Sequence, residues 1–353
     1  MSWEDKVRKV EPYTPGEQPR RSDIIKLNTN ECPYPPSPRV AEALAGFDED
    51  RLRLYPDPAA ADLVNALADY YQVGRDQVFV GVGSDDVLAM AFLTYFTSGK
   101  PILFPDVTYS FYDVWAELFG ITYEKCPLKE DFSLCEQDYF RDNGGIIIAN
   151  PNAPTGLMAD LSVIERIVAG NPESVVIVDE AYVDFGGESA IPLVERYHNL
   201  LVVQTFSKSR AMAGMRIGFA VGSPRLIAYL NDAKFSFNSY TMNHLTISCG
   251  KACVEDDAYF KEITQKIIAT RERVKGELGR LGFTFPDSMT NFLFVTHEQV
   301  NARELFEALK EKGIYVRYFN KPRIDNYLRI TIGTDEQMDA LLAFVEDYMK
   351  NRS

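Results

Sequence analysis

Several short apolar runs along the chain end abruptly in polar residues. The runs at 145–149, 175–178 and 201–203 are rich in isoleucine, valine and leucine, and polar residues follow each of them directly. Continuous β-branched runs of this length are typical of strands that are buried on both faces of a parallel sheet. Helical patterns such as 162–168 separate them. This alternation predicts an α/β fold with a mostly parallel, helix-covered sheet and right-handed crossovers.

The residues before these runs begin irregularly and then follow the same alternation. Residues 1–30 contain prolines that block regular structure, and 30–37 is rich in turn formers. From there the pattern predicts helices at 60–71, from residue 85 and at 109–119, and strands at 78–80 and 101–104.

The chain changes character after about residue 245, where helices and strands no longer alternate regularly. The pattern predicts helices at 258–281, at 302–312 with Gly313 behind it, and from a capping box at Thr334–Gln337, and strands at 291–296, 315–319 and 327–332. We therefore expect an N-terminal segment (1–30), a large α/β domain (31–245) and a small α+β domain (246–353), with a ligand cleft between the two domains.

The bulk composition narrows the class of protein. The chain has 353 residues, of which 46% are hydrophobic and 25% charged, as in a globular protein of about two domains. A formal net charge of -14 argues against non-specific binding to nucleic acid or to anionic membranes. The longest apolar stretch, near 87–96, is too short to span a bilayer, and the first residues do not resemble a signal peptide.

The cysteines and histidines indicate neither a disulfide framework nor a metal site. Five cysteines are scattered at positions 32, 126, 135, 249 and 253, an odd and sparse set that suggests a reduced, cytoplasmic protein. The three histidines do not have the spacing of a metal-binding motif. We expect no bound metal.

Three polar side chains follow predicted strands, and ligands of parallel sheets bind beyond the carboxyl ends of their strands. Lys208, Asp179 and the stretch Asn150–Gly156 offer an amine, a carboxylate and an amide, which could hold the aldehyde, the ring nitrogen and the phenolic oxygen of a pyridoxal ring. Asp179 would keep the nitrogen protonated, and Tyr182 could also contact the phenolic oxygen. We assign Lys208 and Asp179 as catalytic residues.

A phosphate site would complete this cofactor pocket. The loop at 81–86 resembles a phosphate loop at a helix N-terminus, but Asp86 breaks the dinucleotide fingerprint. We expect one phosphate on the amides that follow Ser84, those of Asp85 and Asp86, with both carboxylates pointing away. The other predicted cofactor contacts are two hydroxyls, an arginine fork and a stacking ring: Thr205, Ser207, Arg216 and Tyr109.

Together, the sequence motifs around these residues resemble those of the fold-type-I pyridoxal-phosphate aminotransferases and, more narrowly, of the histidinol-phosphate aminotransferase subfamily. The resemblance covers nearly the whole chain. Its markers are Pro12–Gly16, Lys26–Glu31, Tyr55–Asp57, Gly83–Asp86, Asn152–Gly156, Val178–Tyr182, Thr205–Lys208 and Tyr327–Gly333.

The resemblance implies further roles for particular residues. It implies a homodimer in which Tyr55 reaches the partner's cofactor phosphate. Arg317 and Arg329 would hold the anionic end of the substrate, Asn30 would also bind the substrate, and Tyr13 would close over it from segment 1–30. The superfamily usually has asparagine directly before Pro-Thr-Gly, where this chain has Ala153, so the amide contact would have to come from Asn152.

The implied reaction transfers the amino group of L-histidinol phosphate to 2-oxoglutarate, giving imidazole acetol phosphate and glutamate. An aromatic or broad-range aminotransferase would use the same cofactor residues. A decarboxylase acting on threonine phosphate would share the fold and much of the anion pocket. A cofactor-sensing domain of a transcription regulator would require a basic helix-turn-helix segment, and no such segment precedes residue 30.

Overall fold

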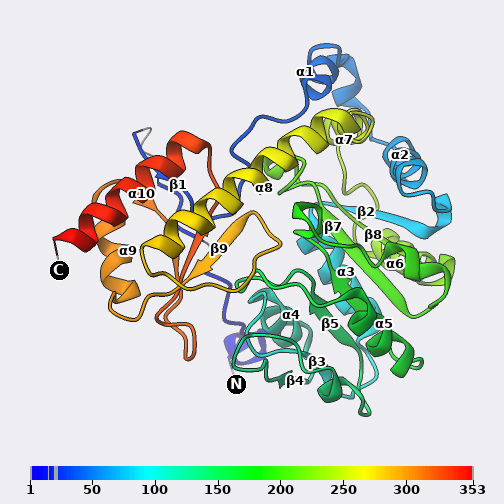
Figure 1. The fold of residues 1–353 in the computed structure, drawn as a ribbon. Helices are drawn as coiled ribbons and strands as arrows, with labels where there is room; N and C mark the ends of the chain where they lie inside the picture. Colours follow the sequence, from blue (N-terminus) through cyan, green and yellow to red (C-terminus); the bar gives the residue numbers. More distant parts are fainter. Residues whose placement is uncertain (1, 15, 20–22, 352–353) are drawn as a thin grey trace.

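The computed structural model describes residues 2–14, 16–19 and 23–351, so Pro15 of the first marker string lies outside the described residues. A large sheet covered by helices forms one unit, and a smaller α+β unit lies beside it (Figure 1). The long helix α8 (Asp257–Arg280) runs from the first unit to the second. The predicted fold class is confirmed.

The large sheet is mostly parallel, as predicted. In the described part of the chain it has seven strands, in the order β2-β8-β7-β6-β5-β3-β4, and β8 alone runs antiparallel to its neighbours. The strands are β2 (Val78–Gly81), β3 (Ile102–Pro105), β4 (Tyr123–Cys126), β5 (Ile146–Ala149), β6 (Val176–Asp179), β7 (Leu200–Thr205) and β8 (Gly218–Gly222).

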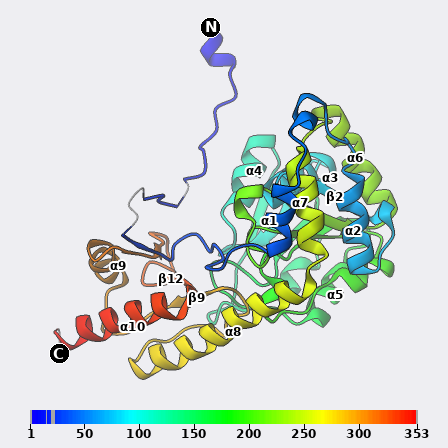
Figure 2. The same ribbon diagram turned by 90° about the horizontal axis from the view of Figure 1, so that it is seen from above.

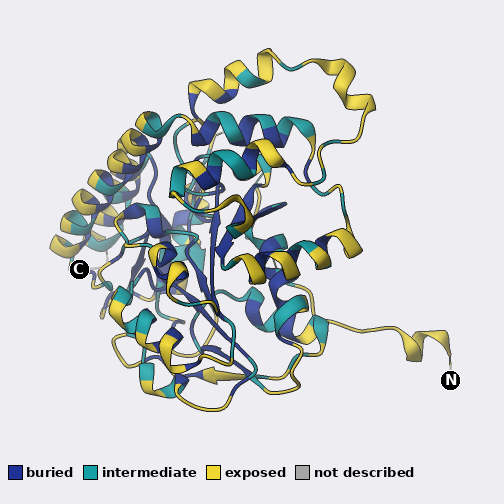
Figure 3. Ribbon diagram, turned by 90° about the vertical axis from the view of Figure 1, so that its right-hand side faces the viewer, coloured by how far each residue is buried: buried dark blue, intermediate teal, exposed yellow. Residues whose placement is uncertain are grey.

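Alternate residues of each strand enter two separate cores, one on each face of the sheet. Ile177 of β6 packs with helices on one face, whereas Val176 and Val178 pack with helices on the other. The first face is covered by α3 (Ser84–Tyr95), α4 (Phe111–Phe119) and α6 (Pro224–Phe237), and the second by α2 (Ala61–Tyr71), α5 (Leu161–Gly170) and α7 (His244–Val254). Figure 3 shows the buried strands between helices whose outer sides are exposed.

The small unit contains a second, antiparallel sheet. Its strands are β11 (Arg317–Tyr318), β12 (Leu328–Thr331) and β9 (Phe292–Val295), and helices α9 (Ala302–Glu311) and α10 (Asp335–Lys350) pack beside α8. The predicted strand at 315–319 is wrong in one respect. It is divided into β10 (Ile314–Tyr315) and β11, because β10 pairs with β1 (Ile25–Lys26) while β11 pairs with β12.

Two details of the predicted helix ends are confirmed. Thr334 and Gln337 form a reciprocal capping box at the start of α10. Gly313 follows α9 with a positive φ of 86°, a conformation that glycine adopts without strain. The other elements are α1 (Pro38–Ala45) and the 3-10 helices η1 (Trp3–Lys6), η2 (Glu49–Arg53), η3 (Arg75–Gln77), η4 (Glu136–Tyr139), η5 (Val183–Phe185), η6 (Ile191–Glu195) and η7 (Ala213–Met215).

The packing suggests different domain boundaries from those expected. Leu27, which follows β1, belongs to the core of the small unit, whereas Cys249 and Cys253 of α7 belong to the core of the large one. We propose that the small domain begins after α7 and that β1 is part of it. The N-terminal end projects outward (Figure 2), although Arg8 and Tyr13 contact α4 of the large unit.

Candidate active site

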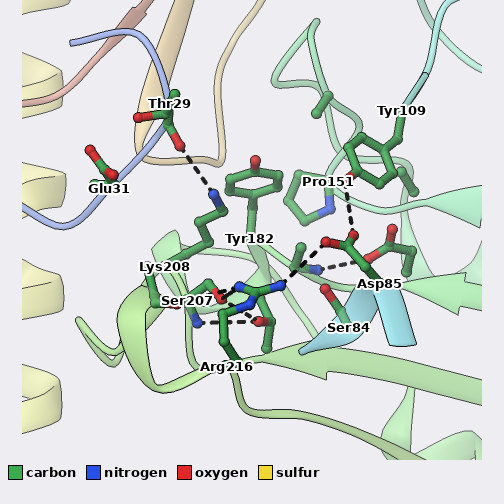
Figure 4. Close-up of a pocket in the computed structure, with 16 residues that line it drawn as sticks. Thr29, Glu31, Ser84, Asp85, Tyr109, Pro151, Tyr182, Ser207, Lys208 and Arg216 are labelled. Atoms are coloured by element: carbon green, nitrogen blue, oxygen red, sulfur yellow. Dashed lines mark hydrogen bonds and ion pairs between the residues drawn. The ribbon is translucent and has the colours of Figure 1, made fainter. Parts of the chain in front are cut away.

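A pocket of about 180 Å³ opens where β5, β6 and β7 end, and Ala149, Asp179 and Thr205 are the last residues of these strands. The position agrees with the general rule for parallel sheets. Most of the predicted cofactor residues line it (Figure 4): Ser84, Asp85, Tyr109, Asp179, Tyr182, Thr205, Ser207, Lys208 and Arg216.

Asp179 lies at the buried wall of the pocket. Its Oδ2 accepts a hydrogen bond of 2.7 Å from the Tyr112 hydroxyl, and its Oδ1 accepts one of 3.2 Å from the backbone N–H of Ala181. Burial raises the pKa of Asp179 to about 6, although both hydrogen bonds oppose this rise. A buried carboxylate of this kind favours a cationic partner.

Lys208 extends into the pocket from the loop after β7. Its Nζ donates a 3.2 Å hydrogen bond to the carbonyl oxygen of Thr29 and lies 5.8 Å from the centre of the Tyr182 ring. The Tyr182 hydroxyl accepts a 2.8 Å hydrogen bond from Nδ2 of Asn30. Asn30 is buried behind Tyr182, where its Oδ1 also accepts a hydrogen bond from Thr331. The structure does not bring Asn30 to the pocket wall, and its contact with the substrate stays a prediction.

Arg216 lies across the pocket floor, close to the start of α3. Its guanidinium donates to Ser207 at 3.4 Å and packs so closely on Gly83 that an added Cβ would lie 2.6 Å from Nη2. The first-turn amides of α3 have no partner within the helix and can bind an anion. Thr205 supports this floor, because its Oγ1 accepts from the backbone N–H of Ser207 at 3.2 Å. Hydroxyls, a guanidinium and helix amides suit a phosphate group.

Both carboxylates at the start of α3 were expected to point away from the pocket, but only one of them does. The carboxylate of Asp85 lines the pocket, where it accepts from the Tyr109 hydroxyl at 2.9 Å and pairs with Arg216 at 3.4 Å. Asp86 points away from the pocket, as expected. Its carboxylate accepts a 2.9 Å hydrogen bond from the Val82 amide and thereby fixes the turn between β2 and α3.

The structure does not place Asn152, from which an amide contact was expected, at the pocket wall. Its Nδ2 donates to the Val107 carbonyl at 2.9 Å and to Thr155 at 3.0 Å, and its Oδ1 accepts from Thr108 at 2.8 Å. These bonds hold the loop in place and use both hydrogens of the Asn152 amide group. Ala153, rather than Asn152, lines the pocket.

Arg317 and Arg329 occupy opposite positions on the paired strands β11 and β12. Both guanidinium groups lie over the ring of Phe319, at 5.7 and 5.6 Å. Burial lowers the pKa of Arg329, and the neighbouring charge of Arg317 acts in the same direction. The Arg329 Nε is buried without a hydrogen-bond partner among the described residues. Neither arginine lines the pocket, but two like charges side by side with an unused donor suit an anion.

The remaining two predicted residues lie away from the pocket wall. Tyr13 stacks on Phe111 at the start of α4, with ring centres 4.2 Å apart. Tyr55 is 79% exposed and stacks on Tyr240 at 4.6 Å. Neither residue lines the pocket of the single chain.

Sequence reasoning missed Tyr112, Thr29 and Glu31. Glu31 lines the pocket beside Lys208 and pairs with Lys26, and this pair lowers the pKa of Glu31 against the opposing effect of burial. Tyr112 reaches Asp179 through the packing of α4 on the sheet, which the sequence around it does not indicate. The loop that carries Thr29 and Glu31 has no periodic pattern.

No cluster of metal-binding side chains was found within residues 2–14, 16–19 and 23–351. Over the same ranges, none of the helices combines the length and the apolar composition that crossing a bilayer requires.

Known proteins resemble this chain over nearly its whole length. A family model described as aminotransferase class I and II matches residues 22–345. A histidinol-phosphate aminotransferase of Lactococcus lactis subsp. cremoris (strain MG1363) is 53% identical, over 100% of this chain and 99% of its own. Another, from Marinomonas sp. (strain MWYL1), is 55% identical over 97% of this chain and 98% of its own.

The fold is also shared with solved structures. The structure of a histidinol-phosphate aminotransferase from Sinorhizobium meliloti in complex with pyridoxal-5'-phosphate is 24% identical, with a TM-score of 0.83 over 94% of this chain and 92% of that one. The predicted resemblance is confirmed, and the chain belongs to the family of class I and II aminotransferases.

Proposed function

We propose that this aminotransferase uses pyridoxal 5'-phosphate to move an amino group between L-histidinol phosphate and 2-oxoglutarate, with imidazole acetol phosphate and glutamate as the products. The observation that carries the proposal is the convergence of Lys208, Asp179 and Arg216 on one pocket. The relatives at 53% and 55% identity carry the name of this activity.

The residues present fit the proposed cofactor. Arg216, Ser207 and the first amides of α3 would hold the phosphate, and the close approach of Arg216 to Gly83 leaves no room there for a larger residue. Asp179 would face the ring nitrogen and Tyr109 would cover one face of the ring. The Tyr182 hydroxyl would bind the phenolic oxygen without help from Asn152. When bound, the cofactor supplies an aldehyde and a ring that accepts electrons.

The residues of the chain then have separate tasks. Lys208 Nζ would hold the cofactor covalently until the substrate amine replaces it, and the free amine would then carry a proton away from the substrate carbon that bears the amino group. Thr29 fixes the Nζ position through its carbonyl oxygen. Asp179 would stabilise a proton on the ring nitrogen throughout. Tyr13 would help to exclude water if segment 1–30 closes over the pocket.

The anion site in the small unit favours a phosphorylated substrate. A phosphate dianion would bind Arg317 and Arg329 together, use the free Nε of Arg329 and relieve the repulsion between the two guanidinium groups. The same reasoning admits a decarboxylase acting on threonine phosphate, so the reaction type needs a direct test. The cytoplasm is the proposed compartment, on the sequence features described above.

The proposed function is tested by incubating the purified protein with pyridoxal phosphate, histidinol phosphate and 2-oxoglutarate and measuring glutamate. Parallel reactions with threonine phosphate measure carbon dioxide, and others with phenylalanine measure aromatic transamination. We expect glutamate from histidinol phosphate at the highest kcat/KM. Absence of glutamate, or carbon dioxide from threonine phosphate as the main product, would reject the proposal.

Replacing Arg329 by glutamine is expected to raise KM for histidinol phosphate and to lower kcat/KM about 100-fold, the effect of losing roughly two charge-assisted hydrogen bonds. The comparison substrate is histidinol, which has no phosphate and whose kcat/KM should change little. Arg166→Gln, which removes a surface arginine paired with Glu136, serves as the control. An equal fall for histidinol and histidinol phosphate would mean that Arg329 only supports the fold.

We also propose that the enzyme is a homodimer in which Tyr55 completes the phosphate site of the partner. Leu52, Leu54 and Tyr55 are exposed at 64%, 53% and 79%, an apolar stretch that suits an interface. Replacing Tyr55 by phenylalanine should weaken cofactor binding about tenfold, as expected for one lost hydrogen bond to a charged group. Analytical ultracentrifugation gives the mass in parallel. A monomer that binds the cofactor equally well with or without the Tyr55 hydroxyl would contradict the proposal.

A further inference from the structure

We propose that Tyr112 is a positioning residue for the reaction, whose hydroxyl orients the Asp179 carboxylate toward the ring nitrogen of the cofactor and stabilises its negative charge. The inference rests on the proposed role of Asp179. It concerns a residue that does not line the pocket and that acts only through Asp179.

The sheet determines which helix can contact Asp179. Along β6, Ile177 enters the core that contains α3, α4 and α6. Side chains two positions apart on a strand point to the same face, so Asp179 points to this face as well. Tyr112 lies in the first turn of α4, directly over that position, and its hydroxyl donates to Oδ2 of Asp179 at 2.7 Å.

The Tyr112 ring is held firmly by aromatic neighbours. It is fully buried, and it meets Phe104 at 5.9 Å and Tyr109 at 5.7 Å in edge-to-face contacts of 70° and 84°. Tyr109 covers the pocket from just before α4, while Tyr112, in the first turn of α4, contacts the carboxylate. The same helix end therefore places both residues relative to each other.

The two oxygens of Asp179 are both restrained. Oδ2 accepts from Tyr112 and Oδ1 accepts from the Ala181 amide, so the carboxylate plane is fixed. A carboxylate oxygen has two acceptor sites, and each oxygen therefore keeps one for a further donor. The donor that the pocket would supply is the N–H of a protonated ring nitrogen.

The direction of the hydrogen bond follows from the two pKa values. Burial and the nearby Asp179 keep the pKa of Tyr112 well above its ordinary value, so the phenol retains its proton and acts as the donor. Burial raises the pKa of Asp179, and Tyr112 provides the largest opposing effect. The other charged groups that act on Asp179 are Asp85 at the start of α3, which raises its pKa, and Lys208 after β7, which lowers it.

The experiment compares Tyr112→Phe with wild type and with Tyr95→Phe. Tyr95 donates a 2.8 Å hydrogen bond to the Leu226 carbonyl away from the pocket, so its variant loses a bond of similar length without touching Asp179. For each protein, pyridoxal phosphate is titrated into the cofactor-free form across a range of pH, and the unfolding temperature is measured without cofactor.

We expect Tyr112→Phe to bind pyridoxal phosphate about tenfold more weakly near neutral pH, the size expected for one hydrogen bond to a charged group. Without this donor Asp179 takes up a proton at higher pH. As the pH is lowered, the affinity for pyridoxal phosphate should therefore begin to fall about one pH unit earlier than in wild type. Tyr95→Phe should leave both properties as in wild type.

Two outcomes would overturn the inference. If Tyr112→Phe keeps the wild-type pH dependence, Tyr112 does not act on the charge of Asp179, whatever happens to the unfolding temperature. Asp179→Asn separates this failure from a failure of the proposed function. If Asp179→Asn weakens binding and Tyr112→Phe does not, only the role of Tyr112 is rejected; if neither weakens binding, the placement of the cofactor is rejected as well.

Discussion

Replacing Lys208 by alanine is expected to lower kcat about 10⁴-fold, the upper end of what a positioned proton-transfer group contributes. The variant should also lose the visible absorbance of a cofactor bonded to lysine. It should no longer form the stable cofactor–lysine adduct that reduction with borohydride produces. Both effects have one cause, because the same Nζ holds the cofactor and then carries the proton. Mass spectrometry of the reduced protein gives the position of the adduct.

The fold should tolerate this change. Within the described residues, Lys208 Nζ donates a hydrogen bond to the Thr29 carbonyl alone and forms no ion pair, so the unfolding temperature should change little. Lys100→Ala, at an exposed lysine paired with Asp142, is the matched control and should keep the adduct. A borohydride-stable adduct that persists in Lys208→Ala would contradict the assignment of Lys208.

Replacing Asp179 by asparagine is expected to weaken pyridoxal phosphate binding and to lower kcat/KM about 10³-fold. Removing one member of a buried charged pair typically costs about 3–5 kcal/mol, and the ring nitrogen would lose its anionic partner. Titration of the cofactor and steady-state kinetics measure the two effects. Wild-type affinity in Asp179→Asn would show that the carboxylate does not face the ring nitrogen.

The same substitution should have the opposite effect on the cofactor-free protein. The pKa of Asp179 is about 6 in the fold, against about 3.9 in an unfolded chain. A raised pKa stabilises the fold only while the group is protonated, so this contribution is lost as pH rises from about 4 through about 6. Above about pH 7 the buried charge costs about 3 kcal/mol, and Asp179→Asn should recover about 1–3 kcal/mol of it. Denaturant unfolding without cofactor, at pH values on both sides of this range, measures the effect, and a variant less stable than wild type above that range would contradict it.

The central sheet was predictable because its strands are buried on both faces. The apolar runs before Asn150, Asp179 and Lys208 correspond to β5, β6 and β7, and the carboxyl ends of parallel strands must meet at one edge. β4 was not predicted because it is an edge strand whose residues are largely exposed. β8 was not predicted because it is short and both begins and ends with glycine. The pairing of β1 with β10 joins residues about 290 positions apart, which no local pattern can indicate.

Within the site, the residue types were predictable from the sequence, but the directions in which their side chains point were not. Asn152 and Ala153 are neighbours in one turn, and the loop's own hydrogen bonds decide which of them faces the pocket. Asp85 and Asp86 are likewise adjacent, yet one faces Arg216 and the other binds the Val82 amide. Tyr112 reaches Asp179 through the packing of α4 on β6, a contact between residues 67 positions apart.

The most direct test is a crystal structure of the protein grown with pyridoxal phosphate. The account predicts a single cofactor bonded to Lys208 Nζ, with the Asp179 carboxylate within hydrogen-bonding distance of the ring nitrogen and the phosphate between Arg216 and the start of α3. A cofactor bound elsewhere, or one whose ring nitrogen faces a group other than Asp179, would contradict it.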